Sequence, residues 1–179
     1  MHARSFVTWV FAILIVALPG TVSAQDPRDV RLADDIARAV VGYPRLTIFD
    51  DIGASVENGV VTITGKVTMP FKRSDIEKRV ARVDGVRSVR NEIGVLPVSQ
   101  FDDDLRYRVA RAIYGNASFW PYASMANPPI HIIVERGHVT LAGVVNSNVE
   151  RMLARSLATG LGELSVTNAL RTDAEMKSE

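Results

Sequence analysis

Residues 58–67 read N-G-V-V-T-I-T-G-K-V, and 78 residues later residues 136–145 read R-G-H-V-T-L-A-G-V-V. The glycines, the β-branched residues and the apolar positions keep their places in the two stretches. Matching blocks also flank both stretches: I-A-R-A-V at 36–40 corresponds to V-A-R-A-I at 109–113, and G-V-R-S-V-R-N-E-I at 85–93 corresponds to G-E-L-S-V-T-N-A-L at 162–170. Three matching blocks in the same order predict a duplicated module.

Each copy of the repeat contains a predicted β-hairpin. Asn58 and Gly59 stand between two runs of alternating apolar residues, a strong signal for a two-residue turn with positive φ at both turn residues. Pairing Glu57 with Val60 gives a buried face in the first copy, and the same pairing around Arg136 gives one in the second. These faces consist of Ala54, Val56, Val61 and Ile63, and of Ile130, Ile132, Val134, Val139 and Leu141. The residues expected to have a structural role in or beside the turns are Asn58, Gly59, Gly65, Gly137 and Gly143.

A helix is predicted before each hairpin and another after it. Asp26 and Pro27 suit the start of the first helix and Gly42 suits its end, while Ser147 and Glu150 form a capping box ahead of the last helix. The residues that recur at helical spacing are Leu32, Ile36, Ala39 and Val40; Ile76, Val80 and Val83 after Pro70; Leu105, Val109, Ala112 and Ile113; and Leu153 and Leu157. Each module then closes with a short strand, at 86–95 and at 164–170.

The predicted fold class is therefore α+β, with two tandem modules of order αββαβ. Each module is expected to form a three-stranded sheet with two helices packed on one face. Module 1 is placed at 26–97, module 2 at 101–172, and a polar C-terminal tail at 173–179.

Residues 1–24 have the pattern of a secretory signal peptide. A basic start, an apolar run at 6–18 and the small residues Val22, Ser23 and Ala24 predict cleavage after Ala24 and export to the periplasm. An uncleaved membrane anchor is disfavoured, because a helix made of this apolar run spans about 20 Å, against about 30 Å for the hydrocarbon core of a bilayer.

Composition narrows the class of protein further. The chain has no cysteine, which excludes disulfides and a lipid-modified amino-terminal cysteine, so we expect a soluble exported protein held together by its cores. Removing Arg4 with the signal peptide lowers Lys+Arg from 21 to 20, which equals the 20 Asp+Glu and leaves a formal net charge of zero. We therefore expect no nucleic-acid partner.

The element order and the motifs at 57–67, 135–145 and 85–93 resemble the BON module, named for bacterial osmotically inducible periplasmic and nodulation proteins. The resemblance implies a non-enzymatic periplasmic protein with two BON modules that supports envelope integrity or osmotic stress tolerance. It also implies binding of anionic phospholipid through the second module, as in some members of that family. Module 2 departs from module 1 in having Glu163 and Leu164 where module 1 has Val86 and Arg87, and in about five extra residues before its hairpin.

The usual catalytic and metal-binding patterns are missing from the sequence. It contains no G-x-S-x-G elbow, no G-x-x-x-x-G-K-[ST] loop and no H-E-x-x-H pair. His131 and His138 are predicted on the outer sheet face, roughly 13 Å apart, which exceeds the span of shared zinc coordination. The acidic run at 102–104 is interpreted as a helix cap and first turn rather than a metal or acid-base site. We therefore predict no enzymatic activity, no cofactor and no metal.

An aromatic segment inside the insertion of module 2 is the candidate binding surface. It contains more rings than a small module buries easily, and Tyr and Trp favour surfaces that are apolar on one side and wet on the other, such as a lipid headgroup layer. The preceding helix carries Arg106, Arg108 and Arg111, which could meet lipid phosphates. The candidate lipid- or partner-binding residues are Arg108, Arg111, Tyr114, Phe119, Trp120 and Tyr122. The alternative is that these rings fill the seam between the modules.

A second basic surface is predicted on the second helix of module 1: Lys72, Arg73, Lys78, Arg79 and Arg82. Because Asp75 and Glu77 are interleaved with these cations, it is interpreted as a solvated helix face with local ion pairs. The leading hypothesis is a peripheral rather than transmembrane protein whose partner is anionic phospholipid or an envelope protein. The alternative function is a periplasmic protein-protein adaptor or chaperone-like module without lipid affinity, which holds its partner at exposed strand edges and the aromatic loop.

Overall fold

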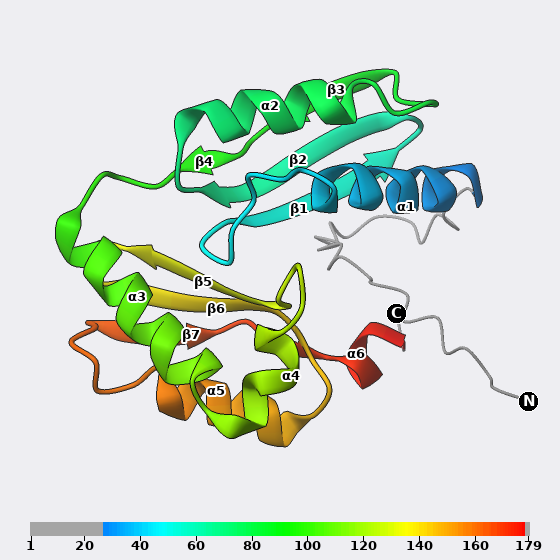
Figure 1. Cartoon of the computed structure of the whole chain (residues 1–179). Helices are drawn as coiled ribbons and strands as arrows, with labels where there is room; N and C mark the ends of the chain where they lie inside the picture. The colour runs from blue at the N-terminus through cyan, green and yellow to red at the C-terminus, as the bar shows by residue number, and fades with distance from the viewer. Residues whose placement is uncertain (1–26, 178–179) are drawn as a thin grey trace, which may run out of the picture.

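The computed structural model describes residues 27–177 and consists of two modules built from corresponding elements, as Figure 1 shows. Module 1 contains α1 (Pro27–Val41), β1 (Asp51–Glu57), β2 (Val60–Val67), α2 (Pro70–Val80), β3 (Ser88–Asn91) and β4 (Gly94–Val95). Module 2 contains α3 (Gln100–Tyr114), η1 (Ala117–Phe119), α4 (Trp120–Ala123), β5 (Ile130–Glu135), β6 (His138–Val145), α5 (Asn148–Leu157), β7 (Ser165–Asn168), β8 (Arg171–Thr172) and α6 (Asp173–Lys177). The predicted α+β class is confirmed. The predicted signal peptide lies outside the described residues, and residues 173–177, expected to be part of a polar tail, form α6.

The two hairpins have the predicted register. Glu57 pairs with Val60, and Glu135 pairs with His138. The turn residues of module 1 have φ values of 51° at Asn58 and 75° at Gly59. Module 2 repeats this geometry, with φ values of 53° at Arg136 and 78° at Gly137. The apolar faces predicted from the alternating pattern accordingly turn toward the helices of each module.

The closing strand of each module runs parallel to the second strand of the hairpin, which gives the strand orders β1-β2-β3 and β5-β6-β7. The single closing strands predicted at 86–95 and 164–170 are wrong, because each is split into two short strands. The Asn91 side chain accepts a hydrogen bond from the Ile93 N–H at 3.1 Å, and the Asn168 side chain accepts one from the Leu170 N–H at 3.3 Å. These asparagines interrupt the closing strand by bonding its backbone locally.

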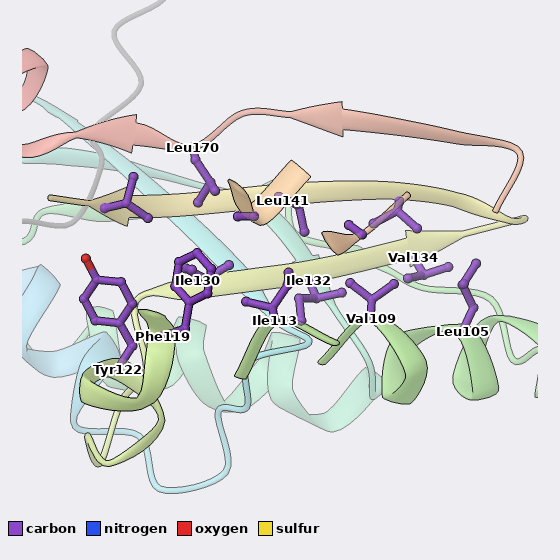
Figure 2. Close-up of a cluster of buried hydrophobic side chains, with 14 residues drawn as sticks. Leu105, Val109, Ile113, Phe119, Tyr122, Ile130, Ile132, Val134, Leu141 and Leu170 are labelled. Atoms are coloured by element: carbon purple, nitrogen blue, oxygen red, sulfur yellow. The ribbon is translucent and has the colours of Figure 1, made fainter. Parts of the chain in front are cut away.

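Each module has its own hydrophobic core. The core of module 2 lies between α3, the aromatic insertion and the β5–β6 hairpin (Figure 2). On α5 the predicted stripe of Leu153 and Leu157 is only partly buried, and the fully buried residues are Ala154 and Ala158. These small side chains let α5 pack closely against the sheet.

The loop that precedes β1 joins the modules. The Ile132 N–H of β5 donates to the Ile48 carbonyl oxygen at 2.7 Å, and the Phe49 ring contacts the Tyr107 ring edge to face, with centroids 5.3 Å apart. Both Ile48 and Phe49 pack against the core of module 2. A more exposed ion pair between Lys66 and Glu135, 3.2 Å long, adds to this seam. In these contacts the ring from module 2 is Tyr107 of α3 rather than a ring of the aromatic insertion.

A buried ion pair anchors the same loop to α2. The Lys72 ammonium lies 2.6 Å from the Asp50 carboxylate, which also accepts hydrogen bonds from the backbone N–H and hydroxyl groups of Thr47 and Thr68. Burial raises the pKa of Asp50, but Lys72 and these hydrogen bonds outweigh burial and hold the pKa below its usual range. Lys72 is only 5% exposed, so its prediction as part of a solvated basic face is wrong.

Candidate functional site

Most rings of the aromatic insertion are structural residues of module 2. Phe119 is fully buried and Tyr122 is 6% exposed, and both contribute to the module 2 core in Figure 2. The Tyr122 hydroxyl donates to the Glu150 carboxylate at 2.7 Å, and the half-buried Tyr114 donates to the Ile130 carbonyl oxygen at 2.6 Å. Burial raises the pKa of both phenols, and at Tyr122 the Glu150 carboxylate raises it further. The module thus buries two of the four rings, Phe119 and Tyr122, while Tyr114 is half-buried and Trp120 is not buried.

Trp120 differs from its neighbours in being 62% exposed. It begins α4, and the buried rings of Phe119 and Tyr122 lie on either side of it in sequence. A large aromatic side chain is thus presented to solvent on a short segment that is anchored at both ends.

The arginines of α3 divide into one structural and two exposed residues. Arg106 is 4% exposed, donates to the Val134 carbonyl oxygen at 2.7 Å and pairs with Asp103, so its expected contact with lipid phosphates is wrong. Arg108 and Arg111 are exposed, and the Arg108 Nε donates to the Leu161 carbonyl oxygen at 3.1 Å. At 100° per residue, Arg108 and Arg111 lie on the same side of α3 as two half-exposed rings, Phe101 and Tyr107. Asp104 interrupts this face with one exposed carboxylate.

We use the name α3 face for Phe101, Asp104, Tyr107, Arg108 and Arg111. The two arginines of this face were predicted from the sequence as binding residues, whereas its two rings were not. The repeat contains a signal for one of these rings. The residue before the acidic run at 102–104 is Phe101, whereas the corresponding residue of module 1, which precedes Asp29, is Arg28. Of the predicted binding residues, the structure leaves Arg108, Arg111 and Trp120 exposed and uses Tyr114, Phe119 and Tyr122 in the interior.

The first aspartate of the acidic run has a second structural role that sequence analysis missed. The acidic run lies in the first turn of α3, as predicted, but its expected role as the cap is wrong, because Ser99 caps the helix. The Asp102 carboxylate also accepts hydrogen bonds from the N–H groups of Arg136 and Gly137, both at 2.8 Å. In module 1, Asp29 accepts equivalent bonds from the hairpin turn at 2.8 Å and 3.2 Å. An aspartate at the third position of each first helix therefore ties that helix to the turn.

Replacing Asp102 with alanine is expected to lower the free energy of unfolding by about 2–3 kcal/mol, because a buried N–H donor at Gly137 and a part-buried one at Arg136 lose a charged acceptor. The corresponding change in module 1, Asp29→Ala, should cost less, because the Asp29 carboxylate is partly exposed and water can replace it. Urea denaturation of both variants measures the difference. Equal losses would contradict the role of burial at Asp102.

The two histidines within residues 27–177 have separate partners. His131 Nδ1 lies 2.6 Å from the Asp50 carbonyl oxygen and therefore carries the proton that it donates. His138 Nδ1 lies 2.8 Å from the Ser165 hydroxyl. No group of three or more His, Cys, Asp or Glu residues among residues 27–177 is arranged to hold a metal ion. Within the same range, no helix is long and apolar enough to cross a membrane.

The fold and its surface define a protein of two tandem mixed α and β modules. The sequence pattern of the BON domain matches residues 28–97 and again residues 102–174. The chain therefore belongs to the BON-domain family, and the predicted resemblance is confirmed. BON domains are associated with phospholipid binding and with envelope and osmotic-stress proteins, and the family is generally non-enzymatic.

Other comparisons add little to this assignment. No curated protein matches the chain. Among solved structures, CdsD, a structural protein of the type III secretion system of Chlamydia trachomatis, is 16% identical, with 83% of this chain and 96% of that chain covered and a TM-score of 0.29. The C-terminal domain of CdsD is 13% identical, with 76% and 94% covered and a TM-score of 0.26. At these TM-scores the likeness carries no argument about function.

Proposed function

We propose that this protein is a non-enzymatic, envelope-associated protein of the periplasm that binds anionic phospholipid surfaces peripherally and supports envelope integrity or osmotic stress tolerance. The observation that carries the proposal is the exposed Trp120, held out from module 2 by its buried neighbours. Tryptophan is favoured at the bilayer headgroup layer because its ring is apolar and its N–H is polar.

The α3 face supports the same proposal. It carries Arg108 and Arg111 beside two exposed rings, and Arg111 lies in the last turn of α3, nine residues before Trp120. Each exposed cation near an anionic membrane contributes about 1 kcal/mol, and this attraction falls off within a Debye length. Rings that enter the headgroup layer and arginines that meet phosphates together give reversible, salt-sensitive binding.

Adding anionic vesicles is expected to shift Trp120 emission to shorter wavelengths. The ring is largely solvated in the free protein, and in the chain that begins at Gln25 it is the only tryptophan, so emission reports this position alone. The test uses vesicles of phosphatidylglycerol and phosphatidylcholine against phosphatidylcholine alone, at low and high salt. Replacing Arg108 and Arg111 with alanine should weaken binding by about thirtyfold, since two cations contribute about 2 kcal/mol together.

The matched control removes two exposed cations from module 1, Lys78 and Arg82, and should leave vesicle binding unchanged within about twofold. Equal weakening by both pairs would indicate general electrostatic attraction rather than the α3 face. Emission from Trp120 that is indifferent to anionic vesicles would contradict the proposed function.

A further inference from the structure

The two copies of the module differ at the groove between their second helix and their closing strand. In module 1, Asn91 on β3 donates to the Arg73 carbonyl oxygen at 3.0 Å and to the Glu77 carboxylate at 2.8 Å, which ties α2 to the strand. In module 2, Asn168 repeats the first bond by donating to the Arg151 carbonyl oxygen at 2.8 Å. The second bond has no counterpart, because the residue that corresponds to Glu77 is Arg155.

With Arg155 in the place that Glu77 has in module 1, the groove of module 2 is open and cationic. The groove has a volume of about 610 Å³ and is lined by Arg151, Met152, Arg155, Ser156, Thr159 and Asn168. Its lining contains no carboxylate, although Glu175 on α6 flanks it and pairs with Arg151 at 2.9 Å. Arg155 is exposed, and its guanidinium has no hydrogen-bond or ion-pair partner within residues 27–177. Arg155 is therefore ready to receive an anionic group.

One wall of the groove is a free sheet edge. β5, at the opposite edge of this sheet, meets module 1, whereas within residues 27–177 β7 pairs with β6 alone. The Leu164 N–H donates to the Gly137 carbonyl oxygen, and backbone groups alternate in direction along a strand, so those of Ser165 and Thr167 turn away from β6. Such an edge accepts an added strand, which gains main-chain hydrogen bonds at the edge and side-chain contacts in the adjoining groove.

The apolar residue of the groove also fits an extended polypeptide. Met152 is 72% exposed, and Val149, one turn earlier on α5, is 75% exposed. An added strand can place an apolar group against Met152 and a carboxylate against Arg155 from residues two positions apart, because side chains at i and i+2 point to the same face of a strand. A lipid headgroup would satisfy the arginine but would leave the strand edge unused.

We propose that the groove between α5 and β7 binds an extended acidic segment of another protein, which adds as a strand to the free edge of β7 and pairs a carboxylate with Arg155. This site lies on different elements from the α3 face and Trp120. It gives the protein a protein-binding function in addition to the proposed lipid binding. The two proposals are tested separately, and either can be refuted while the other stands.

The test is fluorescence anisotropy of the purified protein with a labelled hexapeptide, Glu-Thr-Val-Thr-Glu-Thr, in which the glutamates and the valine share one face of the strand. The peptide should bind, and the same peptide with lysine in place of glutamate should not. Arg155→Glu restores the residue type of module 1 at an exposed position, and it should weaken binding at least about tenfold. Arg155→Gln should weaken it less than Arg155→Glu does. Methylation of alternate backbone nitrogens of the peptide should abolish binding, because it removes the donors that an added strand needs.

Arg82→Glu is the matched control, because it makes the same charge reversal at an exposed arginine of module 1 that belongs to neither proposed site. It should leave peptide affinity within about twofold. Equal weakening by Arg82→Glu and Arg155→Glu, or binding that survives both Arg155 variants or backbone methylation, would overturn the proposal. So would failure of the acidic peptide to bind while Arg155→Glu weakens binding to phosphatidylglycerol vesicles, which would identify the groove as a lipid site.

Discussion

Replacing Gly143 with alanine is expected to unfold module 2. Gly143 has a φ of 106°, and a Cβ atom added to it would lie 1.9 Å from the Pro129 carbonyl oxygen, so the backbone before β5 would have to move. Positive φ alone costs about 1–3 kcal/mol in a non-glycine residue. The steric overlap adds to this, and the total should exceed about 4 kcal/mol, a large part of the stability of a small domain. Chemical denaturation followed by circular dichroism measures it.

Gly160→Ala provides the matched control for this prediction. Gly160 also has a positive φ, 84°, but an added Cβ atom meets no other atom within 4 Å. The variant should therefore lose only the conformational preference of glycine, about 1–2 kcal/mol. If Gly143→Ala were no less stable than Gly160→Ala, the close approach of residue 129 to β6 would not exist in solution.

Replacing Asp50 with alanine is expected to cost about 3–5 kcal/mol, because it leaves the Lys72 ammonium buried without its counter-ion. The control is Lys66→Ala, which breaks the more exposed pair with Glu135 and should cost less than about 1 kcal/mol. Thermal and chemical denaturation of the two variants give the comparison. A loss at Asp50 as small as the loss at Lys66 would show that the ion pair of module 1 is not desolvated.

The pH dependence of the Asp50 effect follows from the direction of its shift. The folded-state pKa of Asp50 is lowered, so the ionised carboxylate stabilises the fold fully above the unfolded pKa of about 4. This stability is lost as pH falls from there through the lower folded pKa. The difference in unfolding free energy between the original protein and Asp50→Ala should thus be constant from about pH 5 to 8 and narrow below about pH 4. A difference that grows on acidification would contradict the assignment.

The hairpin register was predictable because its determinants are local. A two-residue turn fixes the pair Glu57 and Val60, and the period of two in the apolar residues then defines every further pair along the hairpin. The parallel closing strands were harder to define, since their pairing joins segments separated by a helix and their interruption depends on single asparagines. Helical periodicity predicted the cores of α1 and α3 for the same local reason.

The candidate site was less predictable than the fold, because exposure depends on contacts between distant segments. Lys72 looks solvated on its own helix, and only the loop that carries Asp50 buries it. Phe119 and Trp120 are adjacent aromatic residues, yet one is fully buried and the other is 62% exposed. Composition identified the aromatic segment as unusual, but it could not distinguish the ring that anchors the segment from the ring that is presented to solvent.

The loop before β1 has a consequence for the size of the smallest stable unit. The outer edge of β5 donates an N–H to the Ile48 carbonyl oxygen and lies against residues of module 1. A truncation that removes module 1 uncovers that edge together with the apolar surface under Ile48 and Phe49, and such edges recruit strands from neighbouring chains. Duplication here protects against self-association, because the first copy covers the edge through which the second could aggregate.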